Sequence, residues 1–272
     1  MTGPVTAAGV LATARTLLFV PGDRPERFDK AVAAGSDVVV VDLEDAVRGG
    51  HKEQAREAVC AWLAGQPAGH RACVRVNAAG TPWHDDDLAA LRGLAAGVVL
   101  PMAASAFDAT AVHRSTQAPV LALVETARGV LEAAAIAAAE GVVRLGFGAL
   151  DLAAELGTDD PETFARVRTQ LVLASRAAGL EGPVDSVTTD ITDGDVAGRD
   201  ALAGRRVGMG GKLCVHPRQV VPVAAAFAPD VAEVVWARRV LDAGEGGGVA
   251  VLDGAMLDEP VLARARRILE QA

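Results

Sequence analysis

The sequence predicts an α/β fold: a (β/α)8 TIM barrel with a C-terminal helical extension. Short runs rich in Val and Leu alternate with longer stretches rich in Ala, Arg and Glu along the 272 residues. Eight such runs occur, and short continuous apolar runs are typical of parallel strands covered on both faces. No GxGxxG turn follows the first run, so a dinucleotide-binding sheet is not favoured.

Each apolar run is expected to be a strand and each intervening stretch a helix. Asp160-Pro161-Glu162 predicts a helix start, because proline suits the first helical position behind a capping aspartate. A long helix is expected over Arg166–Ala178, ended by Gly179. The expected strands are Thr16–Val20, Asp37–Val41, Ala72–Val76, Gly97–Leu100, Val120–Val124, Val142–Phe147, Val184–Thr188 and Lys212–Val215.

The chain is expected to divide into a barrel over residues 1–228 and an extension over residues 229–272. Helical stretches near Val231–Leu241 and Val261–Glu270 flank a glycine-rich break at Gly244–Gly248. About forty residues are too few for an independent core. The extension is therefore expected to pack on the barrel or on a neighbouring subunit. At the other end, the first fifteen residues are expected to form a loose N-terminal arm.

Composition narrows the classes of function. Aromatic residues make up 3% of the chain, and the formal net charge is −9. Few aromatic side chains are available to stack on bases, and the net charge is not positive. Both facts argue against a nucleic-acid or membrane partner. An anionic substrate would have to be bound by a few local basic residues. No apolar run reaches membrane-spanning length without charge or glycine, and no signal peptide is evident, so the expected location is the cytoplasm.

Charged residues occur where the expected strands end, and in a barrel these ends share one rim. Glu125 and Asp151 follow adjacent strands, and two carboxylates with water and substrate oxygens suit Mg²⁺. Arg24 and Arg75 are candidates for binding carboxylates bidentately. Any single one of these residues is equally well explained as the start of a solvated loop. Together with the acidic cluster Asp42–Asp45, however, they suggest metal-assisted chemistry on a 2-oxo acid.

Six motifs along the chain together resemble one family. They are the opening Thr16–Phe28 with Asp37–Val47, then Val74–Asn77, Ala122–Gly129, Gly148–Leu152, Gly211–Gln219 and Asp253–Pro260. The set is similar to the citrate lyase β-subunit-like proteins of the HpcH/HpaI aldolase and citrate lyase superfamily, which includes malyl-CoA and citramalyl-CoA lyases. The resemblance extends from about Thr16 to Arg267.

The resemblance implies a TIM barrel that assembles as a homo-oligomer, with a trimer favoured. It implies Mg²⁺, with Mn²⁺ as the alternative, on Glu125 and Asp151. Arg75 is expected to contact the keto-acid carboxylate and the reacting oxygen. The remaining site residues implied are Arg24 on the thioester or CoA side, Gly148 and Ala149 at the substrate, Glu44 and Asp45 near the water shell of the metal, and Asp258, which a neighbouring subunit places over the site.

The implied activity is a reversible Claisen-type cleavage of a 3-hydroxyacyl thioester of the malyl-CoA, citramalyl-CoA or citryl type. Its products are a 2-oxo acid, such as oxaloacetate, and an acetyl thioester, with CoA as part of the substrate. Two alternatives stay open: a pyruvate aldolase acting on free aldehydes, and an accessory subunit that binds an acyl-carrier protein. Lys30, Lys52 and Arg56 are candidates for the CoA phosphates, although each is equally well a solvated helix residue.

The sequence departs from the family pattern at three positions. After the fourth strand the family usually shows Pro-Lys-x-Glu-Ser, where this chain has Met102 and Ala104 in place of the lysine and glutamate. The residue before the metal aspartate is often glutamate and here is Leu150. These losses remove a cation and two carboxylates from the rim, which predicts a less charged substrate or weaker catalysis.

Overall fold

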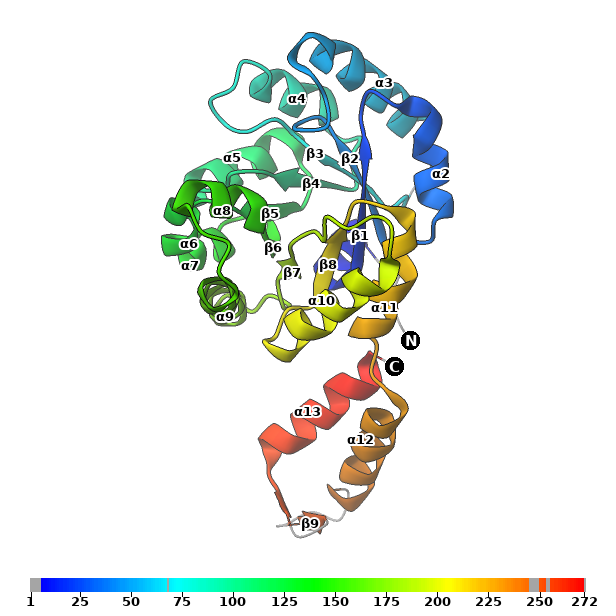
Figure 1. Ribbon diagram of the computed structural model, residues 1–272, viewed down its shortest axis with the longest axis vertical. Helices are drawn as coiled ribbons and strands as arrows, with labels where there is room; N and C mark the ends of the chain where they lie inside the picture. Colours follow the sequence, from blue (N-terminus) through cyan, green and yellow to red (C-terminus); the bar gives the residue numbers. More distant parts are fainter. Residues whose placement is uncertain (1–5, 68, 245–249, 253–254, 272) are drawn as a thin grey trace. The chain divides into compact units, whose positions relative to one another are not determined.

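Eight parallel strands close into a barrel in the order β1 to β8 (Figure 1), as the sequence predicts. The structure is a computed structural model that describes residues 6–67, 69–244, 250–252 and 255–271. The strands are β1 Thr16–Pro21, β2 Val38–Asp42, β3 Ala72–Arg75, β4 Gly97–Leu100, β5 Val120–Val124, β6 Val142–Phe147, β7 Val184–Asp185 and β8 Gly211–Cys214.

Helices connect successive strands and cover the outside of the barrel. The predicted helix start at Asp160 is confirmed, because its side chain accepts a hydrogen bond of 2.8 Å from the backbone N–H of Thr163. The helices of this part are α1 Ala7–Thr13, α2 Phe28–Ala33, α3 Lys52–Ala64, α4 His84–Leu91, α5 Ala106–Thr116, α6 Ala127–Leu131, α7 Ala133–Ala137, α8 Ala149–Leu156, α9 Pro161–Ala177, α10 Gly194–Arg206 and α11 Val220–Phe227, with short 3-10 turns at Pro25–Arg27, Gly49–His51 and Pro217–Gln219.

Strand β7 is shorter than expected, since it ends at Asp185 rather than at Thr188. The carbonyl and hydroxyl groups of Ser186, which follows β7, form hydrogen bonds that are not part of the strand ladder. The carbonyl oxygen of Ser186 accepts a hydrogen bond from Nζ of Lys212, and its hydroxyl accepts one from the backbone N–H of Ala149. The strand ladder therefore ends where the backbone carbonyl group of Ser186 is hydrogen-bonded by a side chain and not by a neighbouring strand.

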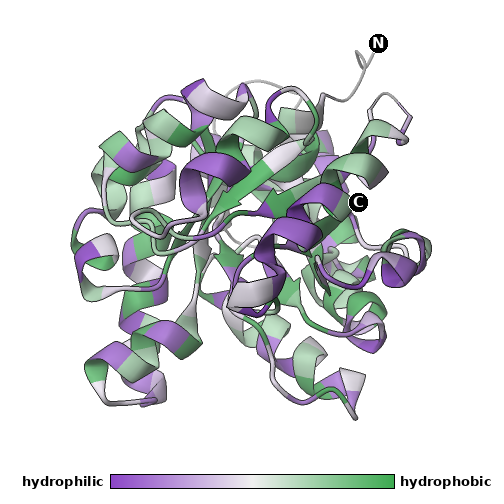
Figure 2. Cartoon of the chain, turned by 90° about the horizontal axis from the view of Figure 1, so that it is seen from above, coloured by the Kyte–Doolittle hydropathy of each residue, from purple (hydrophilic) through white to green (hydrophobic). Residues whose placement is uncertain are grey.

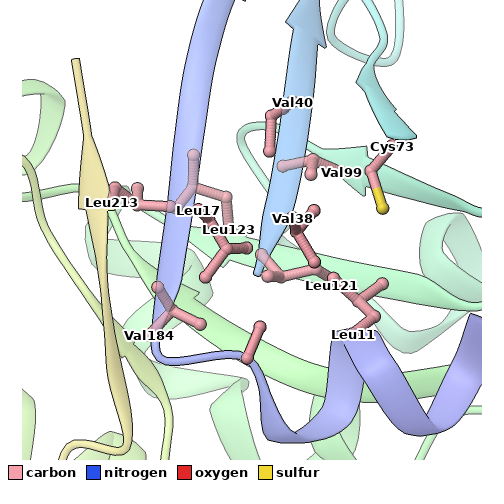
Figure 3. Packing of buried hydrophobic residues seen from close by; sticks show 11 residues of the cluster. Leu11, Leu17, Val38, Val40, Cys73, Val99, Leu121, Leu123, Val184 and Leu213 are labelled. Atoms are coloured by element: carbon pink, nitrogen blue, oxygen red, sulfur yellow. The ribbon is translucent and has the colours of Figure 1, made fainter. Parts of the chain in front are cut away.

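The barrel interior is filled by aliphatic side chains, which accounts for the low aromatic content. Val and Leu from the strands form one buried cluster, with Cys73 among them (Figure 3). Hydrophobic colouring follows the strands, whereas the helices alternate between hydrophobic and hydrophilic residues (Figure 2). Close packing of branched side chains is how barrels of this kind exclude water from their centre.

The N-terminal segment is not the loose arm that we expected, because residues Ala7–Thr13 form α1. Leu11 of this helix is fully buried in the barrel cluster. Arg144 of β6 is 1% exposed and donates hydrogen bonds to the carbonyl oxygens of Ala12 at 2.7 Å and Ala14 at 2.9 Å. Burial lowers the pKa of Arg144 to about 10. Apolar contact and this buried guanidinium together order the segment.

The chain divides into two compact units, Met1–Ala224 and Ala225–Ala272. In the second unit, α12 Val231–Gly244 packs against α13 Glu259–Glu270 around Ala237, Val240 and Ile268. A short antiparallel hairpin, β9 Ala250–Leu252 and β10 Ala255–Leu257, joins the two helices. The predicted glycine-rich break falls mainly on residues 245–249, outside the described residues. The predicted boundary after residue 228 and the packing of the extension remain predictions.

One helical stretch of the described chain, Pro217–Gly244, has the length and hydropathy of a membrane span. It is not one uninterrupted helix, because α11 ends at Phe227 and α12 begins at Val231. Val220 and Val223 of this stretch are buried in the protein, whereas Val221, Val231 and Val235 are exposed. A single stretch of this kind is weak evidence for a membrane partner.

Candidate active site

Residues at the carboxyl ends of the strands line one cavity of about 390 Å³. It contains Asp45, Arg75, Glu125, Gly148 and Asp151, so the structure brings these predicted site residues together. The other residues lining the cavity are Phe19, Val20, Pro21, Asp42, Ala46, Leu123, Leu150, Ser186, Val187, Leu213 and Val215. The wall is mostly apolar, and its charged groups are four carboxylates and one guanidinium.

Glu125 follows β5 and is 2% exposed. Its Oε1 accepts a hydrogen bond of 2.6 Å from the backbone N–H of Met102. Burial raises the pKa of Glu125 to about 8; the Met102 N–H opposes this shift, and the nearby charge of Asp151 adds to it. In the absence of a cation, this carboxyl therefore holds a proton at neutral pH.

Asp151 is exposed and lies in the first turn of α8, one strand further along the rim. Gly148 precedes this helix and has no room for a side chain. A Cβ at Gly148 would lie 2.2 Å from Oε2 of Glu125 and 2.5 Å from its Cβ. Only glycine lets the turn into α8 pass this close to the buried glutamate, and this approach brings Asp151 to the same cavity.

Ala149 does not line the cavity, and its backbone N–H donates to Oγ of Ser186 at 3.0 Å. A contact between Ala149 and the substrate therefore stays a prediction. Ser186, which we did not expect at the site, does line the cavity. A serine inside an expected strand, here Val184–Thr188, carries no distinguishing signal in the sequence, so only the fold could reveal it.

Arg75 ends β3 and is held by three carboxylates. Its Nε and Nη2 donate to the two carboxylate oxygens of Asp42 at 2.7 and 2.6 Å. Its Nη1 lies 2.9 Å from Glu44 and 3.3 Å from Asp45. Burial acts to lower the pKa of Arg75, but the hydrogen bonds and charge of Asp42 outweigh it, so the pKa is raised. The guanidinium is thus oriented before any substrate binds.

Glu44 does not line the cavity, so its connection with the site is through Arg75. Burial raises the pKa of Glu44 to about 8, the Arg75 charge opposes this, and Asp45 adds to it. Asp45 does line the cavity, and 68% of its side chain is exposed. Glu44 and Asp45 therefore have different surroundings: Glu44 is a half-buried partner of Arg75 that does not line the cavity, whereas Asp45 is open to the cavity.

Two predicted site residues lie outside this cavity. The side chain of Arg24 is 48% exposed, and its Nε lies 2.8 Å from Oε1 of Glu26. Asp258 belongs to the second unit, where its carboxylate caps α13 by accepting from the backbone N–H of Val261 at 3.1 Å. Their roles toward a thioester and toward a neighbouring subunit stay predictions.

The three candidates for CoA phosphates have unequal surroundings. Lys30 is exposed. Lys52 is 6% exposed, and its Nζ donates to the carbonyl oxygens of Leu43 and Glu44, so both interpretations from the sequence, phosphate binding and solvation, are wrong. Arg56 forms ion pairs with Asp86 and Asp87. The burial of Lys52 was not predicted, because a lysine at the start of a helix is usually solvated.

The cavity suits a divalent metal held by few protein ligands. Four lining carboxylates face one guanidinium, and repulsion from Asp151 helps to raise the pKa of Glu125. No cluster of three or more His, Cys, Asp or Glu side chains able to hold a metal is present among the described residues. Mg²⁺ commonly takes one or two carboxylates and completes its shell with water and substrate oxygens. The Glu125 and Asp151 pair fits that ion.

Comparison with known proteins identifies the family. The model of the HpcH/HpaI aldolase/citrate lyase family matches residues 15–217, and that of the HpcH/HpaI aldolase C-terminal domain matches residues 232–272. This chain belongs to the HpcH/HpaI aldolase/citrate lyase family. The resemblance noted in the sequence is thereby confirmed, and the chain is a member of a family of lyases.

Curated relatives agree over most of the chain. A citrate lyase subunit beta-like protein of Mycobacterium tuberculosis is 41% identical, with 94% of each chain covered. A (3S)-malyl-CoA thioesterase of Cereibacter sphaeroides is 36% identical, with 95% of this chain and 94% of the relative covered. The family relatives therefore include proteins named for two different reactions.

Solved structures of relatives contain the expected ligands. CitE of M. tuberculosis in complex with magnesium, acetoacetate and coenzyme A matches with a TM-score of 0.83 and 39% identity, covering 96% of this chain and 98% of that one. A citrate lyase beta subunit of M. tuberculosis, complexed with oxaloacetate and magnesium, matches with a TM-score of 0.72 and 38% identity, covering 81% and 99%.

The departures from the family pattern have different positions at the rim. Leu150 lines the cavity and is 54% exposed, so an apolar group stands where an acid is usual. Met102 adopts a left-handed backbone conformation, with φ of 50°, and its N–H donates to Glu125; the residue is 43% exposed. Ala104 is half-buried. The contact of position 102 with Glu125 therefore uses the backbone and does not need the missing lysine.

Proposed function

We propose that this protein is a Mg²⁺-dependent carbon–carbon lyase that cleaves a 3-hydroxyacyl thioester to a 2-oxo acid and an acetyl thioester. One observation carries the proposal: Glu125, Asp151 and the pre-oriented Arg75 line a single cavity. Membership in a lyase family supports it. So do the magnesium, coenzyme A and oxaloacetate in the structures of relatives.

Glu125 and Asp151 are the residues that would hold the metal, with Mn²⁺ as an alternative to Mg²⁺. A divalent cation there would polarise the oxygens of the 2-oxo acid and stabilise negative charge that develops on them. The raised pKa of Glu125 then has a simple meaning. Its carboxyl is costly to ionise without a nearby cation, and it becomes an effective ligand once one is present.

Arg75 is placed to bind the carboxylate of the substrate. Its Nε and one Nη2 proton are engaged by Asp42, and its Nη1 faces Glu44 and Asp45, so a second Nη2 proton remains for a ligand. The bidentate pair with Asp42 keeps the guanidinium plane fixed, which reduces the entropy lost on binding. Gly148 and Ser186 line the wall beside it.

The bond changes are those of a retro-Claisen cleavage. A base takes the proton of the 3-hydroxyl group, its oxygen becomes the carbonyl oxygen of the 2-oxo acid, and the C2–C3 bond breaks. The electron pair of that bond forms the enolate of the acetyl thioester, which is then protonated at carbon. Asp45 is the proposed base, directly or through a water, because it is open to the cavity and is not one of the proposed ligands.

The wall of the cavity favours some acyl groups over others. Arg75 is the one cation among the lining residues, and it already faces three carboxylates. A citryl group carries an additional carboxylate, which would meet an acidic or apolar surface that includes Leu150. We therefore favour malyl-type and citramalyl-type thioesters over citryl thioesters.

Three features predicted from the sequence complete the proposal. They are a homotrimer, Asp258 acting at the site of a neighbouring subunit, and Arg24 with Lys30 on the side of CoA. A pyruvate aldolase and an accessory subunit for an acyl-carrier protein remain the alternatives. The intact set of Glu125, Asp151 and Arg75 favours an enzyme over the accessory subunit.

A panel of malyl-CoA, citramalyl-CoA and citryl-CoA, each with Mg²⁺ and purified protein, tests the proposal. Lyase activity releases a 2-oxo acid and acetyl-CoA, whereas thioesterase activity releases free CoA and the intact hydroxy acid. Glu125→Gln is the control for metal-dependent turnover. Condensation of pyruvate with aldehydes, without any thioester cleavage, would establish the aldolase instead. A co-purifying acyl-carrier protein without either activity would establish the accessory role.

A further inference from the structure

Lys52, at the start of α3, has an ammonium group whose three protons are all bonded inside the protein. Its Nζ donates to the carbonyl oxygen of Leu43 at 2.7 Å, to that of Glu44 at 2.7 Å and to Oδ1 of Asn77 at 2.6 Å. It also lies 5.2 Å from the centre of the Trp83 ring. A buried ammonium is costly, so three short hydrogen bonds, two of them to the same loop, indicate a defined task.

Two of the three acceptors of Lys52, the carbonyl oxygens of Leu43 and Glu44, belong to the loop that follows β2 and carries Glu44 and Asp45. This loop is held from two sides. The carboxylate of Asp42 accepts from the backbone N–H groups of Glu44 at 2.9 Å and Ala46 at 3.1 Å. Lys52 binds the carbonyl oxygens of the same segment. Charged side chains therefore bind the loop backbone on both kinds of group: Asp42 accepts from its N–H groups, and Lys52 donates to its carbonyl oxygens.

The ammonium is itself anchored by a second set of contacts. Asn77 donates from its backbone N and from Nδ2 to Oδ2 of Asp87, at 3.0 and 2.6 Å. Arg56, one helical turn after Lys52, donates to Oδ1 of Asp87 at 3.2 Å. One hydrogen-bond network thus joins α3, the segment after β3 and α4. It consists of Lys52, Arg56, Asn77 and Asp87.

We propose that Lys52 is a positioning residue for the lyase reaction: by binding the carbonyl oxygens of Leu43 and Glu44, it sets Glu44 and Asp45 against the guanidinium of Arg75. Arg75 in turn lines the cavity. The kinetic part of this inference rests on the proposed function, whereas the structural part does not. Lys52 is not among the residues that line the cavity, so its effect passes through the loop.

Lys52→Met and Lys52→Arg separate the geometry of the ammonium from its charge. Lys52→Met removes the donor that the carbonyl oxygens of Leu43 and Glu44 and Oδ1 of Asn77 share, and the carbonyl oxygen of Glu44 keeps only the hydrogen bond from the backbone N–H of Val47. We expect kcat to fall by about 10–100-fold, the usual range when a supporting partner of a site is lost, with KM for the thioester changed by less than about 2-fold. Lys52→Arg keeps the charge but not the geometry, so we expect a smaller loss of kcat.

Hydrogen–deuterium exchange supplies a measurement that needs no turnover. Peptides covering residues 42–47 should exchange faster in both variants, and peptides from α9 should keep wild-type rates. Arg114→Met, which removes an exposed cation paired with Glu140, is the matched control and should behave as wild type. If Lys52→Met fails to fold, Lys52→Arg alone is compared with wild type.

Wild-type exchange over residues 42–47 and wild-type kcat in the folded variants would overturn the proposal. Full recovery of kcat in Lys52→Arg, with unchanged exchange, would also overturn it, since charge alone would then suffice. If the wild-type protein proves to have no lyase activity, the proposed function fails on its own. The exchange data then still decide whether Lys52 holds the acidic loop.

Discussion

The backbone N–H of Met102 donates a hydrogen bond of 2.6 Å to Oε1 of Glu125, and Met102 adopts a φ of 50° to do so. A non-glycine residue in this left-handed region is uncommon and is found mainly where the surroundings enforce it. The contact leaves the second carboxylate oxygen of Glu125 for other partners at the cavity.

The affinity for Mg²⁺ should rise with pH. The metal binds the carboxylate form of Glu125, and the metal-free pKa of this group is about 8, so a proton must leave at lower pH. Calorimetric titrations from pH 6 to 8.5 should show an affinity that increases by about tenfold per pH unit well below pH 8. Glu125→Gln should lose most of the affinity and this pH dependence; a constant wild-type affinity would contradict the assignment.

Gly148→Ala should displace Glu125. The added Cβ would lie 2.2 Å from Oε2 of Glu125, so either the carboxylate or the start of α8 must move. We expect a loss of about 1–3 kcal/mol in the free energy of unfolding, together with weaker Mg²⁺ binding. Gly50→Ala is the matched control, because nothing lies within 4 Å of a Cβ there. Equal Mg²⁺ affinity in Gly148→Ala and wild type would contradict the inference that the turn at Gly148 positions the metal ligands.

Arg75→Met should lower both stability and activity. Asp42, whose side chain is 3% exposed, would lose a bidentate partner. Removing one member of a buried ion pair costs about 3–5 kcal/mol, which denaturant unfolding can measure. Arg75→Lys keeps the charge but not the bidentate geometry, so its stability should be intermediate while turnover stays low. The exposed pair broken by Arg114→Met should cost about 1 kcal/mol or less.

The acyl preference follows from the cavity wall. With Arg75 as the lining cation and Leu150 in the wall, kcat/KM should be higher for malyl-CoA and citramalyl-CoA than for citryl-CoA. Initial rates of 2-oxo acid release measure this order. Leu150→Arg adds a cation to the wall and should shift the preference toward citryl-CoA. A faster reaction of the wild type with citryl-CoA would refute the argument from charge.

Asp258 can be tested without confusing catalysis with helix capping. Its carboxylate caps α13, and asparagine caps a helix about as well, whereas alanine loses about 1 kcal/mol. If Asp258 also serves the site, Asp258→Asn should lose activity while its melting temperature stays near that of wild type. Mixing inactive Asp258→Asn with inactive Glu125→Gln should then restore activity in mixed oligomers. Full activity of Asp258→Asn would show that Asp258 caps α13 and has no role in catalysis.

The parts of the molecule that could be predicted from sequence are those governed by local patterns. The eight strands follow from runs of Val and Leu, and Glu125 and Asp151 share a cavity because adjacent strand ends share a rim. The burial of Lys52 was not predictable, since its acceptors Leu43 and Asn77 are 9 and 25 residues away in the chain. Ser186 was missed for a similar reason: its importance depends on where β7 ends.

The contact of Arg144 with α1 has a consequence for the order in which the molecule is completed. The guanidinium binds carbonyl groups that precede it by 130 residues or more. During synthesis from the N-terminus, α1 is made long before its partner exists, and closing so large a loop is entropically costly. The contacts between α1 and Arg144 therefore form late, after β6 has been made, when more than half of the chain has been synthesised.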